Sequence, residues 1–324
     1  MAKVSVIIPV YGVENYIERC ARSLMEQTLD DIEYIFVNDC TQDSSIEILE
    51  RVISEYKYRE NKVKIVHHEI NRGLPQTRKT GLLHATGEFI AHCDSDDWVD
   101  CELYEKLYES AISSNADIVV CDFFVHRTNG VVDLKVGTRT NDIKTYISNL
   151  LFQKNPLSMV NKLIRREIYS NEIIFPTDNM GEDMATTLQL LAYCRYVSHI
   201  EGAYYHYDGT TVSITRSASK EATLARALQA CRNCCLAIRF YKDSKDVDIK
   251  NGIVHLKFMQ RRQFMPIINH NDAYKIWRCT FPEINRDVIF KRAISISIVE
   301  RIKFLLTLIN VFPLFKQYFR SNLN

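Results

Sequence analysis

The chain has 324 residues, of which 25% are charged and 46% are hydrophobic, and this composition is that of an ordinary globular protein. The formal net charge of +1 argues against a general nucleic-acid-binding protein, so we expect no nucleic acid among its partners. The chain opens directly on an apolar run, without a cationic leader or a small-residue cleavage site, which favours a cytoplasmic protein.

The first hundred residues alternate short β-rich apolar runs with segments of helical periodicity. The patterns predict strands at 4–10, 34–38, 63–67 and 88–93, and helices at 13–27, 44–56 and 74–85. This alternation is typical of a parallel sheet covered by helices. Right-handed crossovers place the carboxyl ends of such strands on one edge, where open α/β sheets bind ligands. We therefore predict an α/β fold with a mostly parallel sheet flanked by helices.

Helical patterns dominate the rest of the chain. Up to residue 220 the sequence predicts helices at 102–114, 142–152, 165–170 and 183–194, a strand at 117–121, and a loop or hairpin at 127–141. Beyond Thr223 it predicts only helices, at 223–241 and 252–264. We therefore predict an α/β domain over residues 1–220 and an α-helical extension over residues 221–324. The ten cysteines are scattered through these elements, which favours reduced packing thiols over disulfides or a zinc site.

The C-terminal segment 288–319 combines apolar residues with spaced lysines and arginines, and it is locally basic from Lys291 onward. Arg301 and Lys303 interrupt its apolar run and Pro313 breaks it near the end, so it is too short to span a bilayer, which takes about 20 helical residues. Two interpretations remain open. The segment lies in the interface of an anionic membrane with its apolar face down, or it packs that face on the rest of the protein.

Polar residues follow the first two predicted strands. Pro9 and Tyr11 end the first strand and Asp39 ends the second, so a parallel sheet brings them together at one edge. A carboxylate there can accept a hydrogen bond from a nucleobase N–H, and an aromatic ring offers a stacking face. Each residue also has an ordinary structural explanation, Tyr11 in the core and Asp39 in a turn. Their coincidence at two successive strand ends favours a nucleotide site.

Three carboxylates lie within four residues after the fourth predicted strand, at Asp94, Asp96 and Asp97. They repel one another unless a cation or hydrogen-bond donors offset their charge, and a hard divalent ion with diphosphate oxygens meets this need. In an extended chain Asp94 and Asp96 face the same way, so this pair is the candidate metal site. For Asp97 and Asp100 we expect a structural role, as caps of the following helix.

Basic residues precede and enter the third predicted helix, and an acidic pair opens a later one. Arg72 and Arg78 are placed to contact phosphate or to hold the metal-site carboxylates, although an arginine on a helix is more often solvated. Glu182 and Asp183 lie at the start of the helix near 183–194. The helix macrodipole alone favours acidic residues in a first turn, so their position is weak evidence for a catalytic base.

Five motifs, taken in order, resemble family 2 glycosyltransferases of the GT-A fold, and in particular bacterial enzymes that build surface polysaccharides. They are VSVIIPVYG, VNDCTQDSS, NRGLPQTRKTGLLHATGEF, DSDD and GEDM. The resemblance is close from Lys3 to about Asp100 and looser to about Thr215. Five motifs in register argue against chance agreement. The resemblance implies a nucleotide-sugar half over about residues 1–100 and an acceptor half over about residues 101–220.

The resemblance also implies roles for the residues at the nucleotide side of the site. It implies that Pro9, Tyr11 and Asp39 hold uracil or another nucleobase. Arg72 and Arg78 would lie beside this pocket. The expected donor is therefore a nucleotide-activated sugar, with a UDP-sugar as the default.

At the reacting end, Asp94 and Asp96 match the DxD motif of the family, which implies ribose contact and coordination of Mg²⁺ or Mn²⁺ on the diphosphate. The matching acidic pair implies that Asp183 is the general base and Glu182 a supporting group. His206, in a Tyr-Tyr-His-Tyr segment that resembles the aromatic segment of the family, is a candidate third metal ligand or active-site donor. The alternative for His206 is a packing residue with satisfied ring nitrogens.

These roles together imply an inverting, metal-dependent glycosyltransferase. It would move a hexose or N-acetylhexosamine from a nucleotide diphosphate sugar to a hydroxyl of a glycan or lipid-linked glycan, at the inner face of the cell membrane. The chain contains neither GxGxxG nor GxxxxGK[ST], which argues against a dinucleotide-dependent dehydrogenase and a P-loop nucleotidase. The remaining alternative is a catalytically silent protein of the same fold that binds nucleotide sugars or acts as a scaffold.

Overall fold

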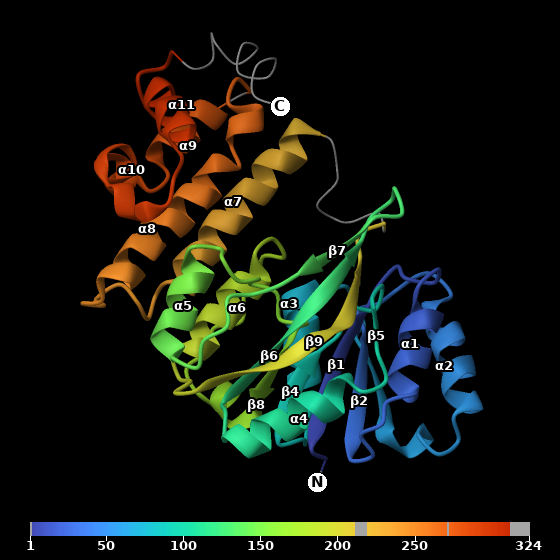
Figure 1. The fold of residues 1–324 in the computed structure, drawn as a ribbon. Helices are drawn as coiled ribbons and strands as arrows, with labels where there is room; N and C mark the ends of the chain where they lie inside the picture. Colours follow the sequence, from blue (N-terminus) through green and yellow to red (C-terminus); the bar gives the residue numbers. More distant parts are fainter. Residues whose placement is uncertain (1, 211–218, 271, 312–324) are drawn as a thin grey trace.

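The computed structural model describes residues 2–210, 219–270 and 272–311, which include a nine-stranded mixed sheet (Figure 1). The strand order is β3-β2-β1-β4-β8-β6-β9-β5, and β7 pairs with β6 off this path. All pairs among the first four strands are parallel. These strands are β1 (Val4–Val10), β2 (Ile32–Asn38), β3 (Val63–His67) and β4 (Phe89–His92). The parallel half predicted from the sequence is therefore confirmed, with strand ends within two residues of the predicted ones.

The second half of the sheet is mixed. Its strands are β5 (Trp98–Val99), β6 (Ile118–His126), β7 (Val132–Lys135), β8 (Lys162–Arg165) and β9 (Val197–Asp208). Strand β8 runs antiparallel to both β4 and β6, whereas β6 and β9 are parallel. Strand β7 forms a hairpin with β6, and β5 runs antiparallel to β9. The loop or hairpin expected at 127–141 is thus a hairpin, while β5, β8 and β9 were not predicted.

Two hydrophobic cores cover the two faces of the sheet. Along β1 the side chains of Val4, Val6 and Ile8 enter one core, and Ile7 enters the other, because successive side chains of a strand point to opposite faces. The first core takes in helices α1, α2 and α4, and the second takes in α5 and α6. The helices of this part are α1 (Ile17–Met25), α2 (Ser45–Glu55), α3 (Leu74–His84), α4 (Leu103–Ser114), α5 (Ile143–Leu151) and α6 (Glu182–Leu191).

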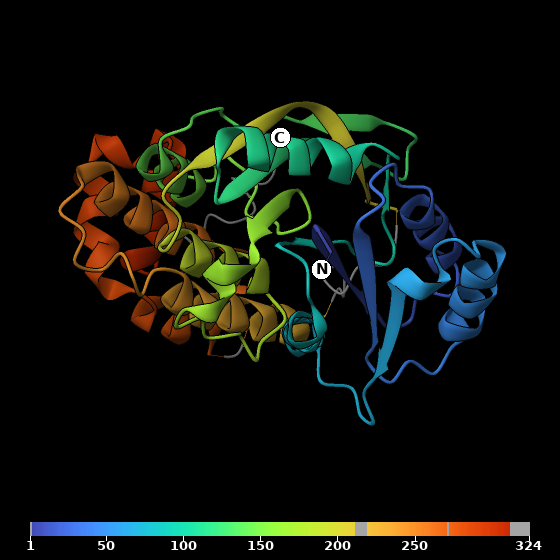
Figure 2. The same ribbon diagram turned by 90° about the horizontal axis from the view of Figure 1, so that it is seen from below.

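Helices follow the sheet for the remainder of the described chain. They are α7 (Lys220–Ala237), α8 (Val247–Arg262), α9 (Ala273–Cys279), α10 (Asn285–Phe290) and α11 (Ile298–Leu308). Both views show them gathered at the end of the molecule away from α1 and α2 (Figures 1 and 2). They have a core of their own, in which the Arg261 guanidinium lies 3.9 Å from the ring centroid of Trp277, beside Phe304. Helix α7 also packs on α6, which joins these helices to the sheet.

Helix α11 carries part of the C-terminal segment whose environment the sequence left open. Its Phe304 is buried in the core of the helical part, so this side of the segment packs on the protein. The opposite side is exposed at Ile298, Ile302, Leu305 and Ile309, which recur at helical spacing. Residues 312–324, including Pro313, lie outside the described residues. Within the described residues, no helix combines the length and apolar character that crossing a membrane requires.

Candidate active site

The ends of β1 and β2 meet at one edge of the sheet, as the parallel arrangement requires. The Asp39 N–H donates to the Val10 carbonyl at 3.0 Å, and the Gly12 N–H donates to Thr41 Oγ1 at 2.8 Å. Pro9 is buried within β1, whereas the side chain of Tyr11 is 54% exposed just beyond the strand. The structure therefore leaves the Tyr11 ring accessible at the predicted nucleotide-binding edge.

The Asp39 carboxylate organises the turn that leads into α3. It is only 4% exposed, and its oxygens accept hydrogen bonds from the backbone N–H groups of Arg72 at 2.8 Å and Gly73 at 2.9 Å. Its Oδ1 atom also lies 2.8 Å from Nδ1 of His68, a residue that sequence reasoning missed. The side chain of Arg72 is exposed beside this turn. Asp39 therefore fixes the loop at 68–73 at the edge where a nucleobase is expected.

A glycine ties this loop to the segment before α6. Gly73 has a φ of +81°, which favours glycine, and a Cβ atom placed there would lie 2.8 Å from Oδ1 of Asn179. That same oxygen accepts a hydrogen bond from the Leu74 N–H at 3.1 Å. The start of α3 and the approach to α6 are thus held together through one side chain.

Arg78 joins the acidic motifs that the sequence placed far apart. Its side chain is almost fully buried, and Nη2 lies 2.8 Å from Oδ1 of Asp94 while Nε lies 3.1 Å from Oε1 of Glu182. Nη2 also lies 3.8 Å from Oδ1 of Asp183. The planar guanidinium can face several carboxylates at once, which a lysine ammonium does less well. The structure thus brings together Arg78, Asp94, Glu182 and Asp183.

The carboxylates of this cluster outnumber its guanidinium. Burial raises the pKa of Glu182 well above its usual range, and the nearby Asp183 adds to this effect. Burial also raises the pKa of Asp94, although the charge of Arg78 opposes the shift. Glu182 Oε2 and Asp183 Oδ1 are buried and form no hydrogen bond within the described residues. The cluster therefore offers carboxylate oxygens without hydrogen-bond partners, which is the type of ligand that a hard divalent cation takes.

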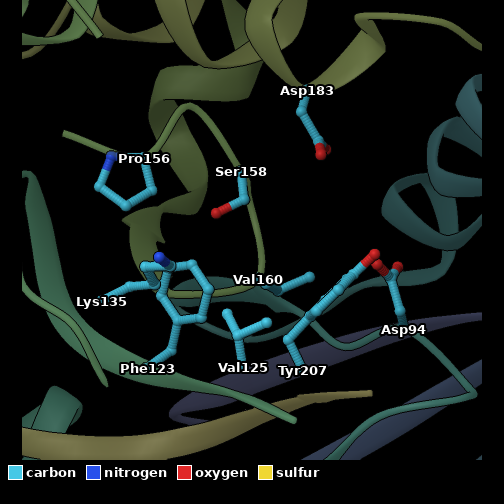
Figure 3. A pocket seen from close by; sticks show the side chains of 9 residues that line it. All are labelled: Asp94, Phe123, Val125, Lys135, Pro156, Ser158, Val160, Asp183 and Tyr207. Carbon is cyan, nitrogen blue, oxygen red and sulfur yellow. The ribbon is translucent and has the colours of Figure 1, made fainter. Parts of the chain in front are cut away.

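A hollow of about 340 Å³ opens beside the cluster, within the range of small-molecule sites. Asp94 and Asp183 lie toward one side of it, and Lys135 and Phe123 lie on the other (Figure 3). Its lining residues come from β6, β7, β9, α6, the end of β4 and the loop before β8: Asp94, Phe123, Val125, Lys135, Pro156, Ser158, Val160, Asp183 and Tyr207. The two acidic motifs thus face one hollow with largely apolar walls.

The other two aspartates of the 94–97 segment, Asp96 and Asp97, have different environments. Asp97 is fully buried and accepts hydrogen bonds from the Tyr205 hydroxyl at 2.5 Å and from the Asp208 N–H at 2.7 Å. Its expected role as a helix cap is wrong, because the cap of α4 is Glu102 and Asp97 anchors β9 instead. Asp96 is partly buried, and its backbone carbonyl accepts a hydrogen bond from Arg19 at 2.9 Å.

His206 belongs to an aromatic cluster at the pairing of β5 and β9. Its ring stacks on Trp98 with centroids 5.0 Å apart, and its Nε2 lies 3.1 Å from Oδ1 of Asp100. Its Nδ1 lies 3.0 Å from Nε2 of His126. This environment is that of a packed histidine with engaged nitrogens. Across the described ranges, no three His, Cys, Asp or Glu residues are grouped to hold a metal ion. A Ser-Ile-Thr stretch at 213–215, which follows this aromatic segment and resembles a Ser-x-Thr element of the family, lies outside those ranges.

Comparison with known proteins defines the class. A model of glycosyl transferase family 2 matches residues 5–172. EpsH from Bacillus subtilis is 34% identical over 226 residues, covering 67% of this chain and 64% of EpsH. The chain therefore belongs to glycosyl transferase family 2. The match spans slightly less than two thirds of the length of EpsH.

Solved structures confirm the fold. A crystal structure of S. aureus TarS 1–349 in complex with UDP has a TM-score of 0.64 at 20% identity, covering 98% of this chain and 91% of that one. A mannosyltransferase from Pyrobaculum calidifontis, in complex with GDP-Man and Mn²⁺, has a TM-score of 0.56 at 16% identity, with 98% and 87% coverage. The predicted GT-A arrangement of sheet and helices, followed by C-terminal helices, is confirmed.

Proposed function

We propose that this chain transfers a hexose or N-acetylhexosamine from a nucleotide diphosphate sugar to a hydroxyl of a glycan or lipid-linked glycan. The observation that carries the proposal is the arrangement of Asp94 and Asp183, which face one hollow and are both close to the buried Arg78. A donor bound along the edge at Tyr11 and Asp39 would place its diphosphate near Asp94. Family membership supports the transfer of a sugar as the reaction class.

We assign UDP-sugars as donors because of the similarity of this chain to solved structures that contain nucleotides. The structural neighbour TarS binds UDP, and the neighbour from Pyrobaculum calidifontis binds GDP-Man with Mn²⁺. We assign nucleobase contact to Pro9, Tyr11 and Asp39, with Arg72 beside the pocket. Asp39 already accepts three contacts from the loop at 68–73, so in our proposal it acts on the base partly by holding that loop.

The proposed chemistry is a single displacement that inverts the anomeric carbon. The Asp183 carboxylate takes the proton of the acceptor hydroxyl, while the acceptor oxygen bonds to the anomeric carbon and the bond to the diphosphate breaks. The electron pair of that bond leaves with the diphosphate. A divalent ion held by Asp94 and Asp96, Mg²⁺ or Mn²⁺, would supply Lewis-acid stabilisation of the leaving group. Glu182 and Arg78 keep Asp94 and Asp183 in place.

A membrane association is the second part of the proposal. We propose that the chain works at the cytoplasmic face of an anionic membrane through the exposed side of α11, at Ile298, Ile302, Leu305 and Ile309. The exposed basic residues Lys291 and Arg292 would face the lipid headgroups. Flotation with anionic liposomes tests this: the wild type should float, and the Ile302→Ser/Ile309→Ser variant should not. Equal recovery of the two proteins would contradict it.

The experiment that tests the transferase proposal is calorimetry of the full chain with UDP-, GDP- and dTDP-sugars, in Mn²⁺, Mg²⁺ or EDTA. We expect one nucleotide class to bind with metal, and Asp96→Ala to weaken that binding at least tenfold. Asp248→Ala is the matched control, because Asp248 is an exposed acidic residue in the first turn of α8. Binding of no nucleotide sugar under any metal condition would contradict the proposal. Binding without turnover would favour the catalytically silent alternative.

A further inference from the structure

A second hollow lies next to the one beside Asp94 and Asp183. This second hollow has a volume of about 310 Å³ and shares Lys135 and Pro156 with the first. Its other lining residues are Val136, Gln153, Lys154, Asn155 and Leu157. The two hollows are therefore adjacent, we call them together the acceptor groove, and Lys135 lines both.

Charge is separated along the acceptor groove. The carboxylates of Asp94 and Asp183 lie at one end, and Lys135 lies across the first hollow from Asp94 (Figure 3). Beyond it, Lys154 lines the second hollow, which has no acidic residue in its lining. The stretch between the two ends is largely apolar, at Phe123, Val125, Pro156 and Val160. A ligand that fills the groove therefore meets negative charge at its reacting end and positive charge at the other.

Strand pairing fixes Lys135 in this position. In the β6–β7 hairpin Lys135 lies directly opposite Phe123, so both side chains leave the same face of the sheet, toward the groove. The nearest carboxylate to the Lys135 ammonium is Asp133 at 4.0 Å, and Asp133 already accepts a hydrogen bond from Arg127 at 2.5 Å. Lys135 thus belongs to a local group of cations that one carboxylate does not neutralise.

The loop that carries Lys154 is also held in place. The Asn155 side chain accepts a hydrogen bond from the Thr138 N–H at 2.8 Å and donates one to the Thr138 carbonyl at 3.0 Å. This pairing ties the loop that carries Lys154 to the chain that follows β7. The spacing between the two lysine-bearing segments is therefore set by the fold.

We propose that the acceptor groove binds a glycan that carries a phosphate or carboxylate group beside the unit with the reacting hydroxyl, and that Lys135 and Lys154 recognise this group. The inference rests on the proposed transferase function, with Asp183 at the reacting end. Phosphate and carboxylate oxygens accept charge-assisted hydrogen bonds from lysine, and such bonds are stronger than neutral ones. Neutral glycans would lose these contacts and leave the groove's positive end unmatched.

The test is binding of fluorescent oligosaccharides of equal length to the full chain, measured by anisotropy without donor. The probes are a neutral oligosaccharide, a uronate oligosaccharide and a polyol-phosphate oligomer. We expect at least one anionic probe to bind ten times more tightly than the neutral one, and Lys135→Ala/Lys154→Ala to remove that advantage. The uronate and phosphate probes distinguish the two sources of charge. Equal binding of all three probes, or full anionic preference in the double variant, would overturn the proposal.

The matched control is Lys245→Ala/Lys250→Ala, which removes two exposed lysines from the helical part and should leave the preference unchanged. Calorimetry with the nucleotide-sugar donor separates this inference from the transferase proposal. We expect the Lys135→Ala/Lys154→Ala variant to bind the donor as the wild type does. Failure of donor binding in the wild type would count against the transferase proposal, whereas probe binding reports on the groove alone.

Discussion

The guanidinium of Arg78 and the carboxylate of Asp94 are paired at 2.8 Å, and Arg78 is the more buried of the two. Although burial alone would lower the pKa of Arg78, the charges of Asp94, Glu182 and Asp183 raise it well above its usual value. Arg78 therefore stays charged and acts as the link between the end of β4 and the start of α6.

Replacing Arg78 should damage both stability and the site. Arg78→Lys keeps the charge but cannot reach two carboxylates with one planar group, so we expect a loss of about 3 kcal/mol in the free energy of unfolding, as when a buried pair is broken. Urea denaturation measures this. Arg261→Lys, at a buried arginine of the helical part, is the control. Both variants should be destabilised, and only Arg78→Lys should also weaken donor binding; unchanged donor binding in Arg78→Lys would refute the linking role.

Replacing Asp39 should loosen the loop before α3. Asp39→Asn removes a charged acceptor of two backbone N–H groups, which we expect to cost about 1–3 kcal/mol of stability. Hydrogen exchange should quicken at 68–73. Asp117→Asn is a matched control, since Asp117 is a buried carboxylate that accepts hydrogen bonds from the N–H groups of Arg195 and Tyr196. Donor binding should weaken in Asp39→Asn and remain normal in Asp117→Asn; the reverse pattern would contradict the assignment.

A pair of glycine substitutions separates backbone strain from the contact with Asn179. Gly73→Ala and Gly130→Ala both force a residue with a side chain to a positive φ, +81° and +78°, at a cost of about 1–2 kcal/mol each. Only at Gly73 would the added Cβ press on Asn179, because nothing lies within 4 Å at Gly130. We expect Gly73→Ala to weaken donor binding and Gly130→Ala to leave it intact. Similar donor affinities in the two variants would show that the contact with Asn179 is unimportant.

Lys162 should make stability depend on pH in a particular direction. Burial lowers its pKa to about 7, and the charge of Asp183 only partly opposes this. Between about pH 7 and the unfolded pKa near 10.4, the unfolded chain holds a proton that the folded chain has lost, so stability rises with pH. The free energy of unfolding of the wild type minus that of Lys162→Met should therefore rise with pH, by at most about 1.4 kcal/mol per pH unit. A constant or falling difference would contradict this.

The same lysine should hold the wall of the acceptor groove. Lys162 Nζ lies within hydrogen-bonding distance of the carbonyls of Pro156 at 2.9 Å and Ser158 at 2.6 Å, and of Oδ1 of Asn161 at 2.8 Å. Lys162→Met removes all three contacts, so we expect faster hydrogen exchange at 156–161 while exchange within β1 stays slow. Unchanged exchange at 156–161 would show that the loop is held by other contacts.

Much of the fold could be predicted because the first half follows simple patterns. Strands β1 to β4 are apolar runs between amphipathic helices, and the sequence placed them within two residues. Strand β8 escaped prediction because its four residues begin with Lys162 and end with Arg165, which read as polar. Its burial depends on the antiparallel partners β4 and β6, which are distant in sequence. Local patterns carry no information about such pairing.

The candidate site was likewise predictable only in part. The motifs gave Asp94, Glu182 and Asp183, and holding the metal-site carboxylates was one of the two roles that the sequence offered for Arg78. The contact of Arg78 with Glu182, 104 positions away, was not predicted. The roles of His68 and Lys162 were missed because each lies in no motif and depends on loops that fold over it. The packing of His206 was one of two alternatives that the sequence left open.

The most direct test of the central claim is sugar transfer by Asp183→Asn, measured beside its donor affinity. Asp183 faces the groove and Asn has nearly the same shape, so the variant should fold and bind the metal–nucleotide sugar normally. Loss of a general base reduces rates by about 10²–10⁴-fold, and we expect transfer to fall by that factor. Transfer at the wild-type rate, with donor binding intact, would show that Asp183 is not the base and that the proposed mechanism is wrong.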